Sequence, residues 1–135
     1  YLKRAVPFQA VINDYKNRIN NQDLPITYIA VYNSMPIGMA SLKEHDLWNR
    51  KDLTPWLASL YVIPECRNMG VGEKLIQTIV FEAHKREFHS VFLFLGQKEK
   101  NTLQTFYIKR GWEFFESAID NDDLETEIMK ISTEN

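Results

Sequence analysis

The stretch from Trp56 to Ile63 is the feature that most narrows the fold. It is a nearly continuous apolar run with a proline on each side, at Pro55 and Pro64. Such a run suits a strand in the middle of a sheet, covered on both faces. After a short loop, residues 70–88 carry an apolar stripe at helical spacing, made of Leu75, Ile76, Ile79, Val80 and Ala83. A buried strand that leads into an amphipathic helix predicts an α/β fold.

The rest of the chain divides into further helices and strands, read from apolar periodicity and turn residues. The expected elements are a helix at about 2–20, strands at 26–32 and 37–42 around a turn at 33–36, a polar loop at 43–54, a strand at 90–95, a helix at 101–110 ended by Gly111, and strands at 112–115 and 125–131. The expected order is α, β, β, β, α, β, α, β, β. We therefore expect one α/β domain over residues 1–135, with a mixed sheet flanked by helices.

Composition and charge exclude several kinds of protein. Sixteen Lys and Arg against eighteen Asp and Glu give a net charge of −2, so no basic field points to nucleic acid or to an anionic membrane surface. No apolar run approaches the ~20 residues that cross a bilayer, and the start does not resemble a signal peptide. Cys66 is the only cysteine, which favours a reducing compartment, and we expect a cytoplasmic protein. The chain begins at Tyr1 rather than Met, which leaves room for residues ahead of it.

The loop between the central strand and the long helix has the makings of a phosphate cradle. The start of a helix presents unpaired backbone N–H groups and a partial positive charge, which together bind phosphate. Gly70 and Gly72 have no Cβ, so the main chain can approach a diphosphate closely, and Arg67 adds a cation. Two glycines alone are also compatible with an ordinary turn. A Walker loop is excluded because no Gly-Lys-Ser/Thr follows, and the third glycine of a dinucleotide fingerprint is missing.

This segment resembles the acetyl-CoA motif of the GNAT acetyltransferase superfamily, Gln/Arg-x-x-Gly-x-Gly/Ala after a strand that ends in Val-x-Pro. Arg67, Gly70 and Gly72 fill the three fixed positions, and Val62 and Pro64 fit the lead-in. Asn68 and Met69 depart from the Gly and the basic residue that members often carry. A second motif, an aromatic-Tyr-x-x-x-Gly-aromatic helix ending, is matched by residues 106–112. The resemblance covers about residues 26–130, and residues 44–58 look like a bacterial subgroup of small, poorly assigned members.

The resemblance implies a GNAT-like sheet, mostly antiparallel, with a splayed central pair of strands, and an enzyme that moves the acetyl group of acetyl-CoA to an amine. It assigns acetyl-CoA binding to Leu60, Tyr61, Val62, Arg67, Asn68, Met69, Gly70, Val71, Gly72 and Asn101. Tyr107 is the candidate general acid, because a phenol with a pKa of ~10 stays protonated at neutral pH beside a thiolate leaving group. Glu44 is the candidate base, with His45 and Asp46 as alternates.

Other readings and residues stay open. The chain is also compatible with a CoA sensor without turnover, or with a nucleotide-binding regulatory domain. Cys66 is read as an incidental thiol, Trp56 and Trp112 as core residues, and Trp48 as a candidate wall of the acceptor pocket. The sequence has no Cys/His spacing typical of a metal site, so we expect no metal. The amine acceptor, a small molecule or a peptide, is not specified, and a homodimer is compatible with the fold.

Overall fold

A mixed sheet forms the body of the protein. The computed structural model describes residues 11–16, 24–96 and 100–134. Within them, seven strands lie in the order β1-β2-β3-β4-β5-β7-β6, and neighbours are antiparallel except for the parallel pair β4 and β5. The strands are β1 (Val11–Lys16), β2 (Ile26–Tyr32), β3 (Met35–Lys43), β4 (Trp56–Val62), β5 (Ser90–Leu95), β6 (Glu113–Ile119) and β7 (Glu125–Ser132). The helices are α1 (Val71–Lys85) and α2 (Lys100–Ile108), with a short 3₁₀ turn η1 (Pro64–Cys66). The expected α/β fold with a mostly antiparallel mixed sheet is confirmed.

The predicted first helix is wrong where the structure describes it. Val11–Lys16 forms the edge strand β1, in antiparallel register with β2 from Val11 opposite Val31 to Lys16 opposite Ile26. The backbone groups of this segment therefore bond to a neighbouring strand, and this tertiary pairing overrides the helical spacing of its apolar residues. The other parts of the predicted helix, residues 2–10 and 17–20, lie outside the described residues.

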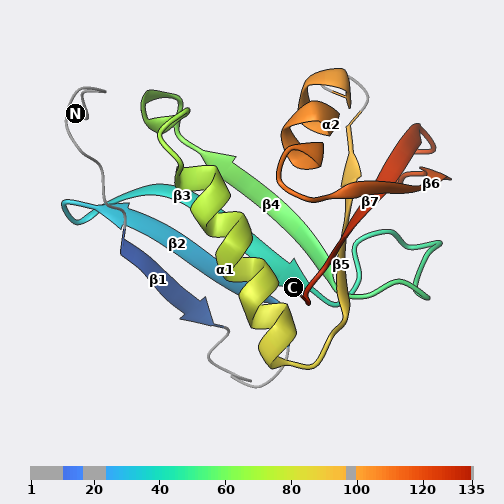
Figure 1. Ribbon diagram of the computed structural model, residues 1–135, viewed down its shortest axis with the longest axis horizontal. Helices are drawn as coiled ribbons and strands as arrows, with labels where there is room; N and C mark the ends of the chain where they lie inside the picture. Colours follow the sequence, from blue (N-terminus) through green and yellow to red (C-terminus); the bar gives the residue numbers. More distant parts are fainter. Residues whose placement is uncertain (1–10, 17–23, 97–99, 135) are drawn as a thin grey trace.

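Helix α1 lies across β2, β3 and β4 (Figure 1) and is fastened to them in two ways. Gly38 of β3 lets the helix come close, since a Cβ there would lie 3.2 Å from Leu75 Cδ1 and 3.3 Å from Val71 Cγ1. The Tyr28 hydroxyl of β2 donates a hydrogen bond of 2.7 Å to the buried carboxylate of Glu82. These contacts fix α1, and with it the loop ahead of the helix, relative to the central strands.

The two faces of the sheet carry two apolar clusters. The larger cluster joins α1 and α2 to the strands and includes Leu75, Ile79, Tyr107 and Trp112. The smaller cluster is made of Leu47, Leu53, Trp56, Phe92 and Ile128, and it anchors the loop between β3 and β4. Trp56 and Trp112 are buried, as expected for core residues. No helix in the described part of the chain is long and apolar enough to span a membrane.

The central strands β4 and β5 separate soon after they meet. Their pairing is limited to Trp56 opposite Phe92, where the Phe92 N–H donates to the Pro55 carbonyl at 3.0 Å. Beyond that point the two strands diverge, as Figure 1 shows. On its other side β4 carries a bulge, because Ala58 lies opposite Ser41 while Tyr61 lies opposite Met39. Ser59 sits in this bulge with φ at 57°, and bulges bend a strand away from its partner. The expected splayed central pair is confirmed.

Candidate active site

A cavity of about 200 Å³ opens where β4 and β5 separate. Its walls come from both strands, from α2 and from the β3–β4 loop (residues 44–55). The lining residues are Asp46, Leu57, Ala58, Ser59, Leu60, Leu93, Phe94, Leu95, Leu103 and Tyr107. The lining is mixed, with apolar side chains beside the polar side chains of Asp46, Ser59 and Tyr107. The Asp46 carboxyl and the Tyr107 phenol are the groups in it that exchange protons more readily than the Ser59 hydroxyl. A concave site with a few convergent polar groups is typical of a small-molecule site.

The loop at the start of α1 has the geometry of an anion cradle. The residue before the helix is Gly70, with φ at 87°, and no side chain caps the N-terminus of α1. Asn68 also adopts a left-handed conformation, with φ at 62°. The first turn of any helix has N–H groups without intrahelical partners, so α1 offers these donors to a ligand. A Cβ at Gly70 would meet nothing within 4 Å, and one at Gly72 would make ordinary contact with Val62 Cγ2 at 3.8 Å and Phe106 Cζ at 4.0 Å.

Arg67 is held against the end of β4. Its Nε donates to the Val62 carbonyl at 2.8 Å, and its guanidinium lies 5.4 Å from the centroid of the exposed Tyr61 ring. Both contacts leave the guanidinium at the surface beside the cradle, where an arginine recognises phosphate oxygens. Met69 packs partly against the core, and Asn101 is exposed in the first turn of α2. The structure therefore groups Arg67 to Gly72 at one place, while Asn101 belongs to the other helix.

Tyr107 enters the cavity from the last turn of α2. The helix ends in a Schellman motif, in which the Trp112 N–H donates to the Tyr107 carbonyl at 3.1 Å and Gly111 has φ at 95°. The Tyr107 ring packs edge-on against Phe106 and Trp112, at centroid distances of 5.2 and 5.6 Å. Burial raises the pKa of Tyr107 to about 12, against a smaller opposing effect of Arg110. The phenol is therefore protonated at neutral pH, as an acid catalyst requires.

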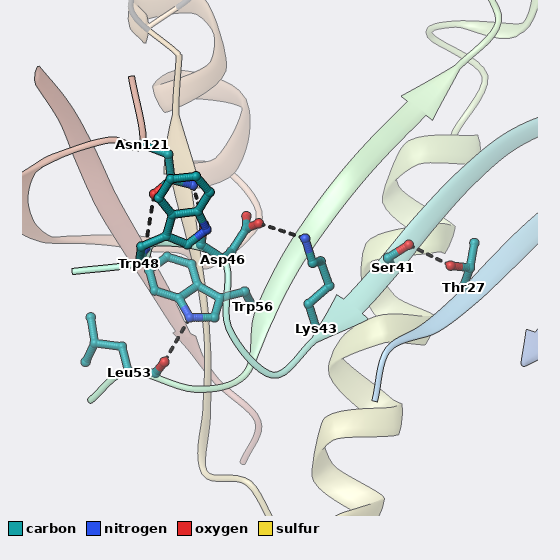
Figure 2. Close-up of polar contacts among 8 residues, drawn as sticks. All are labelled: Thr27, Ser41, Lys43, Asp46, Trp48, Leu53, Trp56 and Asn121. Atoms are coloured by element: carbon teal, nitrogen blue, oxygen red, sulfur yellow. Dashed lines mark hydrogen bonds and ion pairs between the residues drawn. The ribbon is translucent and has the colours of Figure 1, made fainter. Parts of the chain in front are cut away.

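Asp46 is the carboxylate that the structure brings to the cavity. It accepts a hydrogen bond of 3.1 Å from Lys43 Nζ, and its side chain is 18% exposed (Figure 2). Glu44 and His45 are exposed, and neither is among the residues that line the cavity. The Glu44 carbonyl accepts a hydrogen bond from the Thr54 hydroxyl at 2.6 Å, which closes the base of the loop. Of the three candidate bases, only Asp46 shares the cavity with Tyr107.

Trp48 lies beside the β6–β7 turn (residues 120–124) rather than in the cavity wall. Its side chain is 72% exposed, and its backbone N–H donates to Asn121 Oδ1 at 3.1 Å (Figure 2). Asp120 closes this turn, since its Oδ1 accepts from the N–H groups of Asp122 and Leu124. Asn121, Leu103 and Phe94 were not singled out from the sequence.

Two other features do not line the cavity. An open groove of about 1020 Å³ runs along α1 to the end of β7, but neither the cradle loop nor Tyr107 lines it. Cys66 is 2% exposed, and burial, helped by Glu65, raises the pKa of its thiol, which suits an inert side chain. Among the residues that the structure describes, no group of three or more His, Cys, Asp or Glu side chains is placed to hold a metal ion.

Solved structures share this fold. One, from Bacillus anthracis, is described as a streptothricin acetyltransferase and is in complex with acetyl coenzyme A. It is 23% identical with a TM-score of 0.67, over 83% of this chain and 64% of that chain. A GNAT acetyltransferase from Elizabethkingia anophelis, with acetyl-CoA bound, is 14% identical with a TM-score of 0.69, over 91% and 97%. An IAA acetyltransferase from Bacillus cereus is 17% identical with a TM-score of 0.70, over 92% and 99%. The chain thus spans less than two thirds of the streptothricin enzyme.

No curated protein is similar enough to this sequence to match it. A family model, however, does match. The model of the acetyltransferase (GNAT) family matches residues 4–112, which include the cradle loop, the bulged strand and Tyr107. The geometry agrees with that match, because the splayed strands, the uncapped helix start and the buried phenol lie together in one region. The chain belongs to the GNAT acetyltransferase family.

Proposed function

We propose that this protein transfers the acetyl group of acetyl-CoA directly to a primary amine, with both substrates bound at once. The observation that carries the proposal is the cavity between β4 and β5, which a protonated phenol and a carboxylate line together. A phenol can supply a proton to a leaving thiolate, and a carboxylate can take one from an attacking amine. We propose direct attack by the amine without an acetyl-cysteine intermediate, since Cys66 is buried and is not among the cavity residues.

The residues present fit acetyl-CoA, which supplies the acetyl thioester when bound. The uncapped first turn of α1 and Arg67 would hold its diphosphate, with Asn68, Met69, Gly70, Val71 and Gly72 forming the cradle. The backbone of Leu60, Tyr61 and Val62, which follows the bulge in β4 and has no paired residue on β5, would bind the pantetheine arm. Asn101 is a further candidate contact from α2. Backbone N–H groups near Leu60 would polarise the carbonyl, an effect worth ~3 kcal/mol per donor.

Proton transfers are assigned to two side chains. Tyr107 donates its hydroxyl proton to the sulfur as the carbon–sulfur bond breaks. Asp46 accepts the proton that the amine nitrogen loses as the carbon–nitrogen bond forms. Lys43 Nζ lies 3.1 Å from Asp46 Oδ1 and pairs with this carboxylate. Glu44 remains the other carboxylate of this segment, and its exposure supports a role through water rather than direct contact.

The acceptor is proposed to be a small molecule with a basic amine. The name of the Bacillus anthracis relative points to streptothricin as the substrate of that protein. A carboxylate in a cavity of about 200 Å³ suits one amine group at the end of a larger molecule that stays outside. We therefore propose the same chemical class, amines that bear additional polar groups, without a specific member.

The test is release of free CoA thiol with streptothricin, spermidine, kanamycin and lysine as acceptors. Wild type should turn over at least one amine, and Tyr107→Phe should lower kcat at least tenfold while the KM for acetyl-CoA stays within about twofold. Equal rates for the two proteins would remove Tyr107 from the mechanism. Tight acetyl-CoA binding without turnover would support a sensor, and a thermal shift larger with ATP or NAD than with acetyl-CoA would support a nucleotide-binding domain.

The two carboxylates are separated by a second comparison. Asp46→Asn should lower kcat/KM for the amine at least tenfold, and Glu44→Gln should lower it less. The opposite order of effects would assign the base to Glu44.

A further inference from the structure

The β6–β7 turn reaches across to the β3–β4 loop through one side chain. Asn121 Oδ1 accepts a hydrogen bond from the Trp48 N–H at 3.1 Å, and Asn121 Nδ2 donates one to the Asp46 carbonyl at 3.0 Å (Figure 2). Both ends of one amide thus bind the backbone on the two sides of Leu47. That residue is fully buried in the smaller apolar cluster. Residues 46–48 are therefore held by the packing of Leu47 on one side and by the two hydrogen bonds of Asn121 on the other.

Asp46 depends on this contact for its position. Its side chain lines the cavity with Tyr107, and its carboxylate pairs with Lys43, whose side chain is 40% exposed. A lysine on a flexible stem fixes a carboxylate loosely, whereas the hydrogen bond to the Asp46 carbonyl acts on the backbone that carries the side chain. The direction of the carboxylate into the cavity is thus set by the backbone at Asp46.

Asn121 is not needed for the turn that carries it. The turn is closed by Asp120, whose N–H donates to the Leu124 carbonyl at 2.7 Å and whose Oδ1 accepts from the Asp122 and Leu124 N–H groups at 2.8 and 3.0 Å. The same loop is also tied to β6 by Asn49, which donates to the Ile119 carbonyl at 3.2 Å, and by Arg50, which pairs with Glu116 at 3.1 Å. Loss of the Asn121 side chain should therefore leave the turn in place, together with the part of the loop that Asn49 and Arg50 hold.

We infer that Asn121 is a positioning residue for the amine half of the reaction, acting through Asp46. The inference rests on the proposed acetyl transfer in this cavity. Asn121 does not line the cavity and does not touch the acetyl-CoA cradle, so its influence should fall on the acceptor and not on acetyl-CoA.

The experiment measures both KM values with the panel amine that wild type uses best. Asn121→Ala should raise the amine KM severalfold, up to the limit of about tenfold that the two lost hydrogen bonds set, and leave the acetyl-CoA KM within about twofold. Asn49→Ala is the matched control, since it removes one hydrogen bond between the same loop and hairpin without touching residues 46–48. An equal rise of the amine KM in both variants would refute positioning by Asn121, because general loosening of the loop would explain it.

A double-mutant cycle tests whether Asn121 acts through Asp46. If it does, Asn121→Ala should add little to Asp46→Asn, within about twofold, whereas independent effects would multiply. Full multiplication would overturn the inference. An unchanged amine KM in Asn121→Ala would overturn it while leaving the proposed function intact, and absence of turnover by wild type with every amine would overturn both.

A readout that needs no turnover completes the test. Trp48 is exposed, while Trp56 and Trp112 are buried, so a soluble quencher removes mainly the emission of Trp48. The difference between measurements with and without quencher therefore reports on Trp48. Asn121→Ala should lower the steady-state fluorescence anisotropy of this residue, since its N–H loses its partner, and Asn49→Ala should change it less. Identical anisotropy in wild type and Asn121→Ala would show that the amide does not hold this loop.

Discussion

Glu82 is the buried carboxylate that joins α1 to the sheet, and it gives the sharpest prediction about stability. It accepts hydrogen bonds from the Tyr28 hydroxyl at 2.7 Å and from Arg86 Nε at 2.8 Å, and Lys85 Nζ lies 3.2 Å away. Burial by itself would raise the pKa of Glu82, but these partners outweigh it and lower the pKa from 4.5 to about 2. The charged form is therefore the one that the folded protein stabilises.

The size of the effect follows from the two pKa values. One pKa unit corresponds to about 1.4 kcal/mol, so the shift from 4.5 to about 2 contributes about 3 kcal/mol to the free energy of unfolding. Because the pKa is lower in the folded protein, this contribution is complete above about pH 5. It is lost as the pH falls from about 4.5 towards 2, where the folded protein also takes up the proton.

The assay is urea unfolding of wild type and Glu82→Gln at several pH values between about 7 and 2. At pH 7 the variant should be less stable by about 3 kcal/mol, since a neutral amide replaces the charged acceptor. Its stability should then fall less steeply below pH 5 than that of wild type. Glu73→Gln is the control, because the Glu73 side chain is 49% exposed in its pair with Arg110 and its loss should cost under about 1 kcal/mol. Parallel curves for wild type and Glu82→Gln between pH 5 and 2 would refute the reasoning.

Three further predictions concern the cradle, a helix end and the thiol. Gly72→Ala should leave the free energy of unfolding unchanged or raise it by up to ~1 kcal/mol, because the new Cβ has room and alanine favours helix. The same substitution should weaken acetyl-CoA binding in a calorimetric titration. Unchanged affinity would argue against close approach of a diphosphate. Glu87→Gly should stabilise the protein by about 1 kcal/mol and so raise its thermal midpoint, because residue 87 lies just after α1 with φ at 69°, where glycine is unstrained. A lower midpoint would contradict this. Cys66 should react with Ellman's reagent at least tenfold more slowly in the native protein than in urea, because it is buried and its pKa is raised; equal rates would contradict its burial.

Much of the fold could be predicted because local pattern and tertiary environment agree. The apolar run of β4, the stripe of α1 and the strand Ser90–Leu95 lie where expected, with ends within about three residues. The turn at Asn33 and Ser34 also forms, with φ at 49° and 64°. The first helix failed over Val11–Lys16 because pairing with β2, a contact between distant parts of the chain, determines that segment.

The candidate site could be predicted only where a local sequence motif encodes it. The cradle loop and Tyr107 follow local sequence, since a glycine-bounded helix start and a helix ending before Gly111 are local structures. The carboxylate in the cavity depends instead on how residues 44–48 fold back, a segment in which Leu47 is buried and the Asp46 carbonyl accepts a hydrogen bond from Asn121. Asn121 lies 75 residues from Asp46, and no periodicity links the two positions. The sequence therefore favours Glu44 with Asp46 as an alternate, whereas the structure places Asp46 in the cavity lining.

The most direct test of the proposed chemistry is a crystal structure of this protein with acetyl-CoA bound. The expected result is a diphosphate on the N–H groups of Asn68 to Gly72 and a thioester sulfur within about 3.5 Å of the Tyr107 hydroxyl, between β4 and β5. A diphosphate bound in the open groove between α1 and the end of β7, or a sulfur remote from Tyr107, would contradict it.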